Sequence, residues 1–159
     1  MLFLTPKSGG FPRAAIVLVA LLALGLPLDT AWARMVSVAS PRAALRAGPG
    51  AKYEPLWEFG QGYPLKVVSS KESWYKVVDF ENDSGWIEKN QTTGTPHVVV
   101  KAQNAELRSG PGPKYRQVGS AVRGVVFRVL DKGKKGTWIK VRHADGPEAW
   151  ISRSKVWGQ

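Results

Sequence analysis

The sequence contains no cysteine, and this absence excludes several classes of protein. Disulfide frameworks, thiolate-held zinc or iron–sulfur centres, cysteine nucleophiles and lipid-anchored cysteines all require that residue. Glycine and proline, at 17 and 11 of 159 residues, are too few for a low-complexity disordered chain. The hydrophobic fraction of 43% is typical of a globular protein, so stability is expected to come from packing alone.

The sequence is also poor in groups that perform catalysis or bind metal ions. Its two histidines, His97 and His143, have no second ligand at metal-binding spacing. The acidic segment from Asp79 begins like a calcium loop, but Ser84 replaces the required glycine and Asn90 the bidentate glutamate. No serine lies in a nucleophile-elbow motif. We expect a protein without metal, cofactor or catalytic residues, and not an enzyme.

No apolar run is long enough to cross a bilayer. Residues 14–28 form a run of 15, whereas a membrane helix needs about 20 residues. The run follows Lys7 and Arg13 and precedes Ala31-Trp32-Ala33, a small-x-small cleavage pattern. We predict an N-terminal signal helix within residues 1–33, removed after cleavage; a retained signal anchor is the alternative. The mature protein is then exported to the periplasm or secreted, without a transmembrane segment.

The rest of the chain repeats itself. Seven of the nine positions of residues 45–53 recur identically in residues 107–115, at an offset of 62. A two-residue insertion near Lys132 then raises the offset to 64. Beyond it two tryptophans match between the copies, Trp74 with Trp138 and Trp86 with Trp150. An internal repeat of this length defines the domain organisation.

The duplication divides the mature chain into two units of about 60 residues. We predict a first domain over residues 34–90, a polar linker over 91–96 and a second domain over 97–159. Each unit is near the lower size limit for independent folding. The large buried area of tryptophan is therefore expected to contribute to stability.

Neither unit contains a helical pattern, and short β-branched segments separated by glycine and proline predict strands. In the first unit we expect strands near residues 35–39, 43–46, 64–70, 73–79 and 85–88. Residues 81–85, ENDSG, predict a hairpin turn, because Asn82 and Asp83 tolerate turn dihedrals and Gly85 supplies a positive φ. The predicted fold class is all-β, with two small, strongly bent antiparallel barrels.

The motifs together resemble the bacterial SH3-like (SH3b) domain. Each unit contains Leu-Arg-x-Gly-Pro-Gly, a tyrosine three residues later, Trp-x-Lys-Val and Gly/Ala-Trp-Ile. Residues 53–57 and 63–68 make the first unit similar to the exported proteobacterial type. The second unit departs from that type in two places, where Trp57 is matched by Gly119 and Tyr63 by Val125.

The resemblance implies tandem five-to-seven-stranded barrels and a non-catalytic module that binds cell-envelope material. Peptidoglycan peptides are the typical ligand class that it implies. Two alternatives remain open: an adaptor that binds a periplasmic protein, and a small cell-wall hydrolase. Nucleic acid would suit a basic, aromatic chain, but export argues against it.

Arginines, tyrosines and tryptophans of the shared motifs are the candidates for ligand binding. They are Arg46, Tyr53, Trp57, Trp74, Trp86, Arg108, Tyr115, Trp138 and Trp150. Each has a structural alternative: the paired tryptophans would equally form the cores, and the arginines would brace the Gly-Pro-Gly loops through backbone carbonyls. The loops themselves predict rigid turns rather than phosphate sites, because proline lacks an N–H and no helix follows.

Positive charge is concentrated in the second unit. Residues 34–96 hold 8 basic and 7 acidic residues, whereas residues 97–159 hold 13 and 4. Since a shared fold does not need this asymmetry, it indicates either an anionic partner or simple solubility. The candidate anion-binding residues are Lys114, Arg116, Arg123, Arg128, Lys132, Lys134 and Lys135.

Overall fold

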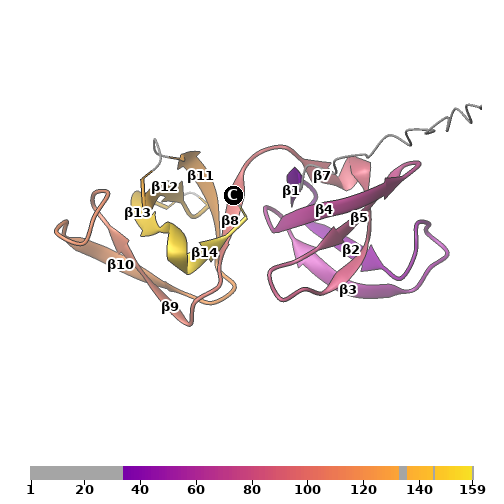
Figure 1. Ribbon diagram of the computed structural model, residues 1–159, viewed down its shortest axis with the longest axis horizontal. Coiled ribbons are helices and arrows are strands. Elements are labelled where there is room, and N and C mark those ends of the chain that lie inside the picture. Colours follow the sequence, from indigo (N-terminus) through magenta and orange to yellow (C-terminus); the bar gives the residue numbers. More distant parts are fainter. Residues whose placement is uncertain (1–33, 133–135, 145, 159) are drawn as a thin grey trace, which may run out of the picture. The chain divides into compact units, whose positions relative to one another are not determined.

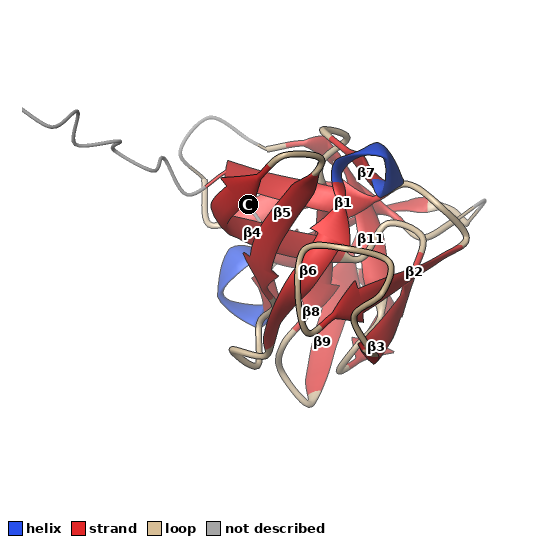
Figure 2. Cartoon of the chain, turned by 90° about the vertical axis from the view of Figure 1, so that its right-hand side faces the viewer, coloured by secondary structure: helices blue, strands red, loops and turns tan. Residues whose placement is uncertain are grey.

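A computed structural model describes residues 34–132, 136–144 and 146–158. Strands dominate these residues, and two short 3-10 helices are the helical elements among them (Figures 1 and 2). The prediction of an all-β chain is confirmed. In the described part, no helix has the length and apolar character needed to cross a membrane. The predicted signal helix, Lys134 and Lys135 lie outside the described residues.

The first repeat forms one antiparallel sheet of seven strands. Its elements are β1 (Arg34–Val38), β2 (Arg42–Arg46), β3 (Pro55–Gly60), β4 (Pro64–Lys71), β5 (Trp74–Val78), β6 (Ser84–Glu88), η1 (Lys89–Gln91) and β7 (Thr92–Thr93). Neighbouring strands follow the order β3-β2-β6-β5-β4-β1-β7. Sequence reasoning missed β3 and β7.

The second repeat has the same architecture. Its elements are β8 (His97–Val100), β9 (Asn104–Arg108), β10 (Gln117–Val122), β11 (Val126–Asp131), β12 (Trp138–Arg142), β13 (Glu148–Ser152), η2 (Arg153–Lys155) and β14 (Val156–Trp157). The order β10-β9-β13-β12-β11-β8-β14 matches the first sheet strand for strand. The sequence duplication is therefore a duplication of a complete fold.

Alternation along the strands gives each sheet a buried face and an outward face. In β12, Ile139 and Val141 are fully buried, whereas the residues on either side of them remain partly exposed. The first core consists of Val36, Val38, Ala43, Leu45, Leu65, Val77 and Ile87. The second consists of Val98, Val100, Ala105, Ala121, Phe127, Val129, Ile139, Val141, Ile151 and Val156. Apart from Phe127 in the second core, both core clusters consist of aliphatic side chains, and the paired tryptophans belong to neither.

The turns are set by local backbone chemistry. Gly62 and Gly124 occupy equivalent positions, and both have positive φ, at 82° and 88°, which suits glycine. In the hairpin between β5 and β6, Asn82 adopts φ 69°. The expectation that Gly85 supplies the positive φ is therefore wrong. Gly85 is required for space instead, because a Cβ there would lie 2.8 Å from Leu45 Cγ.

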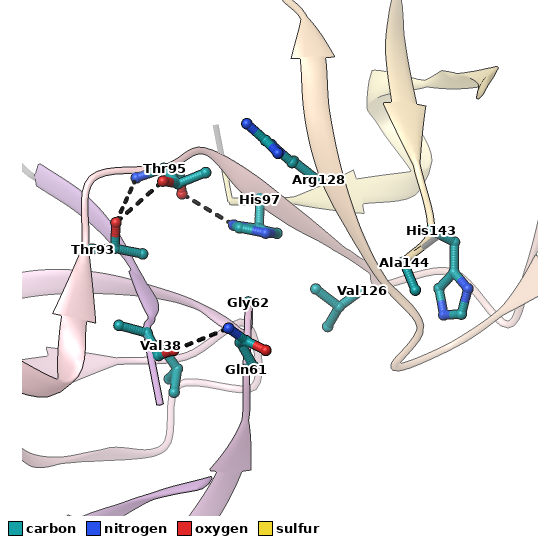
Figure 3. A pocket seen from close by; sticks show the side chains of 11 residues that line it. Val38, Gln61, Gly62, Thr93, Thr95, His97, Val126, Arg128, His143 and Ala144 are labelled. Atoms are coloured by element: carbon teal, nitrogen blue, oxygen red, sulfur yellow. Dashed lines mark hydrogen bonds between the residues drawn. The ribbon is translucent and has the colours of Figure 1, made fainter. Parts of the chain in front are cut away.

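The segment expected to be a linker is partly strand. Within it Thr92 and Thr93 form β7, which pairs with β1. The carbonyl of Thr95 accepts a hydrogen bond from the Ser37 hydroxyl at 2.9 Å. The same carbonyl lies 3.0 Å from Nδ1 of His97 (Figure 3). These contacts fix the local path of the chain after the first sheet.

Candidate functional site

Each sheet presents an arginine, a tryptophan and a lysine side by side on its outward face. In the first repeat Trp86 of β6 is paired with Arg46 of β2 and with Lys76 of β5. Directly opposed residues on paired strands point to the same face, with Cβ atoms about 5 Å apart. The three side chains therefore form a row across three strands, with a half-buried tryptophan at its centre.

The second repeat reproduces this row. Trp150 of β13 is paired with Arg108 of β9 and with Lys140 of β12. Trp150 is again half-buried. The two sets define the cationic tryptophan rows, which consist of Arg46–Trp86–Lys76 and Arg108–Trp150–Lys140. The lysines were present in the Trp-x-Lys-Val motif but were not among the predicted site residues.

The arginines of the rows also hold the Gly-Pro-Gly loops, as the structural alternative expected. Arg46 Nη1 donates to the Tyr53 carbonyl at 2.8 Å. Arg108 Nη1 donates to the carbonyls of Pro113 and Tyr115, both at 2.7 Å. One side chain therefore links the row to the loop beside it.

Each loop tyrosine packs flat against the first glycine of its loop. A Cβ added to Gly48 would lie 2.5 Å from a ring carbon of Tyr53, and one added to Gly110 would lie 2.3 Å from Tyr115. The glycines are thus needed for close approach of the ring. Tyr53 and Tyr115 nonetheless keep 38% and 37% of their surface exposed, so they combine a structural contact with an accessible ring.

The remaining candidate tryptophans differ in their environments. Trp74 is 7% exposed, so it is buried although it lies outside the main core cluster. Its counterpart Trp138 is half-buried and lines a cleft of about 460 Å³ in the second repeat. Trp57, on the edge strand β3, is 51% exposed. The structure therefore leaves Trp57 and Trp138 accessible and covers Trp74.

Acidic residues modify the second row. Glu148 forms ion pairs with Lys140 and with Arg142, the latter at 2.5 Å. Hydrogen bonds from these two cations lower the pKa of Glu148. Glu106 pairs with Arg108 in a further charge-assisted contact. The second row is therefore embedded in a mixed but predominantly basic network.

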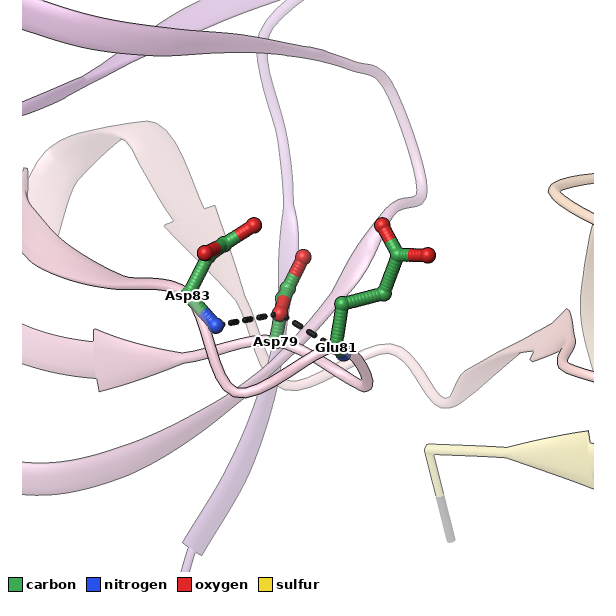
Figure 4. Close-up of side chains that lie close together, drawn as sticks. All are labelled: Asp79, Glu81 and Asp83. Atoms are coloured by element: carbon green, nitrogen blue, oxygen red, sulfur yellow. Dashed lines mark hydrogen bonds between the residues drawn. The ribbon is translucent and has the colours of Figure 1, made fainter.

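The acidic cluster of the first repeat is a hydrogen-bonded turn. Asp79 is 4% exposed, and its Oδ1 accepts the backbone N–H groups of Glu81 and Asp83 at 2.8 and 2.9 Å (Figure 4). Burial, together with the nearby Asp79 carboxylate, raises the pKa of Tyr63. The three carboxylates also lie close enough together to suit a metal ion. Asp79 Oδ1 is engaged by the turn and Oδ2 accepts the Tyr63 hydroxyl at 3.4 Å, which fits the turn interpretation of this segment.

The described members of the predicted basic set are exposed. They are Lys114, Arg116, Arg123, Arg128 and Lys132. Arg128 is paired across β11 and β12 with Arg142, so two cations stand opposite each other. Like charges in this position repel each other, and the Glu148 carboxylate that is ion-paired with Arg142 offsets part of this repulsion.

Comparison with known proteins gives distant relatives of larger size. The chain is 23% identical over 130 residues to "Putative N-acetylmuramoyl-L-alanine amidase YrvJ" of Bacillus subtilis (strain 168), covering 75% of this chain and 24% of that protein. It therefore spans about a quarter of this relative.

Among solved structures, NlpC2 from Trichomonas vaginalis is matched at TM-score 0.36 and 11% identity, over 80% of this chain and 48% of that one. An NlpC/P60 family protein from Bacillus cereus ATCC 10987 is matched at TM-score 0.35 and 16% identity, over 77% and 55%.

Models of protein families match both repeats separately. Residues 39–94 match one bacterial SH3 domain model, and residues 103–156 match another. The matched ranges contain the Leu-Arg-x-Gly-Pro-Gly loop and the central tryptophan of each row. The resemblance inferred from the motifs is thereby confirmed, and the chain belongs to the bacterial SH3 domain family as a tandem pair.

Proposed function

We propose that this protein is a non-catalytic, exported module that binds peptidoglycan peptides through its outward sheet faces. The observation that carries the proposal is the repeated cationic tryptophan row. A half-buried indole beside two cations suits a ligand with flat apolar surface and carboxylate or carbonyl groups. The distant similarity to a protein named as an amidase of N-acetylmuramoyl-L-alanine supports a cell-wall ligand.

The non-catalytic role is supported by the environment of the histidines. The His97 ring lies against the Thr95 carbonyl, and the His143 ring stands edge-on to Phe127 at 5.6 Å between centroids. In the part of the chain that the structure describes, neither ring is hydrogen-bonded to a serine, threonine or carboxylate side chain. A base without a nucleophile beside it does not form the pair that acyl-transfer catalysis uses.

Retention of the mature chain on purified peptidoglycan tests the proposal. The Trp86→Ala/Trp150→Ala variant removes the centre of both rows and should reduce retention about tenfold or more, since central aromatic anchors carry much of a binding energy. Trp57→Ala is the matched control, because Trp57 is exposed but belongs to neither row. No retention of the wild-type chain at low salt refutes the proposal.

The basic surface of the second repeat adds electrostatic attraction to an anionic envelope component in this proposal. Cations spread over one domain raise association rates and make binding salt-sensitive. Export is supported by the basic and apolar N-terminal pattern. N-terminal sequencing of the protein from the membrane-free fraction tests cleavage after Ala33.

A second function, as an adaptor for an envelope protein, is favoured by one specific surface. Among the strands of the described residues, edge strand β3 has a partner on one side only. It carries Leu56 and Trp57 at 48% and 51% exposure. Exposed edges accept added strands from protein partners. If crosslinking in the native host captures an envelope protein with wild type but not with Trp57→Ala, the adaptor function is supported over wall binding.

A further inference from the structure

A cleft on the outward face of the second repeat is lined by residues that do not belong to the cationic tryptophan rows. It has a volume of about 460 Å³ and is lined by Asn104, Glu106, Trp138, Ser152 and Lys155. All five come from the second repeat, on β9, β12, β13 and η2. An aromatic wall with a few convergent polar groups is the usual character of a small-ligand site.

Strand geometry places these residues together. Trp138 and Ser152 are directly paired between β12 and β13. Asn104 and Glu106 share the outward face of β9, because the alternate residue Ala105 is buried at 2% exposure. Lys155 is the last residue of η2, the 3-10 helix that directly follows β13. The cleft therefore rests on rigid strands at three sides and on a short helical turn at the fourth.

The charges in the cleft leave one cation unbalanced. Glu106 is neutralised by Arg108, whose Nε and Nη2 both donate to the same carboxylate oxygen. Within residues 34–132, 136–144 and 146–158, no carboxylate forms a salt bridge with Lys155. Lys155 thus offers its ammonium group to a ligand, next to an indole ring.

The first repeat shows that this charge is not demanded by the fold. At the positions of Ser152 and Lys155 it carries Glu88 and Gln91, which replace a hydroxyl and a cation by an anion and an amide. Its equivalent of Trp138, Trp74, is buried at 7% exposure. The other two lining positions, Asn104 and Glu106, correspond to Arg42 and Ala44, and Arg42 is ion-paired with Glu58. The second repeat therefore differs in carrying its cation, Lys155, outside the ion pairs of the described residues.

We propose that the cleft binds the free carboxylate end of a short peptide. Lys155 pairs with the carboxylate, the Ser152 hydroxyl and the Asn104 amide hydrogen-bond the adjoining peptide group, and Trp138 packs against a small apolar side chain. This inference rests on the proposed function, because it assigns the class of wall peptide that the second repeat recognises. It makes the two repeats unequal, with the carboxylate site in the second one.

The test follows the indole N–H resonance of Trp138 by NMR in the mature chain, assigned with Trp138→Phe. The probe is the dipeptide D-alanyl-D-alanine, and its C-terminal amide is the matched ligand without the carboxylate. We expect the free acid to shift the resonance with a Kd on the order of 1 mM, a weak affinity typical of so small a ligand. The amide should produce no saturating shift.

Three variants define the site. Lys155→Gln, the residue of the first repeat, should weaken binding about tenfold, because it removes a charge-assisted contact. Ser152→Glu should abolish measurable binding by repulsion of the carboxylate. Lys71→Gln makes the same change of net charge at an exposed position of β4 in the first repeat and should leave the Kd unchanged.

The outcomes separate this inference from the proposed function. Equal shifts by the acid and the amide, or an unchanged Kd in Lys155→Gln, overturn the carboxylate site. A response of Trp138 to oligomers of N-acetylglucosamine alone overturns it in favour of a sugar. If peptidoglycan retains the protein while Trp138 stays silent, the cleft is refuted and the proposed function stands; failure of both refutes the two together.

Discussion

The two repeats share a sheet order strand for strand, yet they use their edges differently. In the first repeat Trp57 of β3 lies opposite Leu45 of β2. In the second repeat Gly119 of β10 lies opposite Leu107 of β9. Leu45 is consequently fully buried, and Leu107 is only partly buried. The same scaffold therefore has a covered core edge in one copy and an open one in the other.

The difference continues along the edge strands. The first repeat adds Phe59 and Tyr63, whose rings stack with centroids 4.2 Å apart. Their counterparts in the second repeat are Ala121 and Val125. Aromatic area is concentrated in the first repeat and positive charge in the second. Divergence has thus exchanged aromatic area at the margin of the core and charge on the surface, while the core residues kept their strand positions.

Truncation of Leu45 and Leu107, which lie opposite the edge strands, should show the largest difference in stability between the two repeats. Leu45→Ala removes a fully buried side chain and should cost about 2–5 kcal/mol of unfolding free energy. Leu107→Ala should cost clearly less, because that leucine is already partly exposed. Urea unfolding of the full chain, followed by amide signals of each repeat, measures both values. Equal costs would mean that Trp57 and Gly119 do not set the burial of the leucines.

Removal of positive charge should have the next largest effect, and chiefly in the second repeat. Changing Lys114, Arg116 and Arg128 to glutamine should weaken binding to anionic vesicles on the order of 10- to 100-fold at low salt, since each cation near such a surface contributes about 1 kcal/mol. Changing Lys52, Lys66 and Lys71 of the first repeat is the matched control, with a smaller loss expected. Vesicle co-sedimentation at rising salt measures the difference, and equal losses would contradict a one-sided basic surface.

Exchange of glycine and alanine at one equivalent position should show how tightly each core is packed. Gly85 of β6 corresponds to Ala149 of β13, and a Cβ at Gly85 would lie 2.8 Å from Leu45 Cγ. Gly85→Ala should therefore destabilise the first repeat by about 1–3 kcal/mol through overpacking. Ala149→Gly should destabilise the second by about 1 kcal/mol, through added backbone freedom and a lost contact. Thermal unfolding that shows Gly85→Ala to be neutral would mean that Leu45 can move aside.

Much of the fold was predictable because the duplication amplified weak signals. The Trp-x-Lys-Val and Gly/Ala-Trp-Ile segments are strands in both repeats, as their alternation predicts. Strand β3 was missed because Pro55 opens it and its exposed apolar residues do not alternate with polar ones. Strand β7 was missed because two polar threonines carry no strand pattern; only their pairing with β1 defines it.

The candidate site was predictable only where both repeats share it. Recurrence identified Trp86 and Trp150, but it could not tell a core residue from a residue of the outward face. The register with Arg46 and Arg108 supplied that distinction. Lys155 was missed because the cleft depends on residues in which the repeats differ, and one sequence gives no reason to favour such positions.

The smallest predicted effect is a pH dependence at the start of the second repeat. Burial lowers the pKa of His97, and the Arg128 charge across the strand pair lowers it further, against a hydrogen bond to Thr95 that raises it. The unfolded chain therefore takes up a proton first as the pH falls below about 6.5, the ordinary value for histidine. Stability that is present above that pH should decline as the pH falls toward the lower pKa of the folded state. Urea unfolding should give a lower free energy of unfolding at about pH 5 than at about pH 8, and this decrease should be smaller in His97→Gln. The part of the decrease that remains in the variant comes from other titrating groups. An identical pH dependence in wild type and variant would show that His97 is as readily protonated in the folded chain as in the unfolded one.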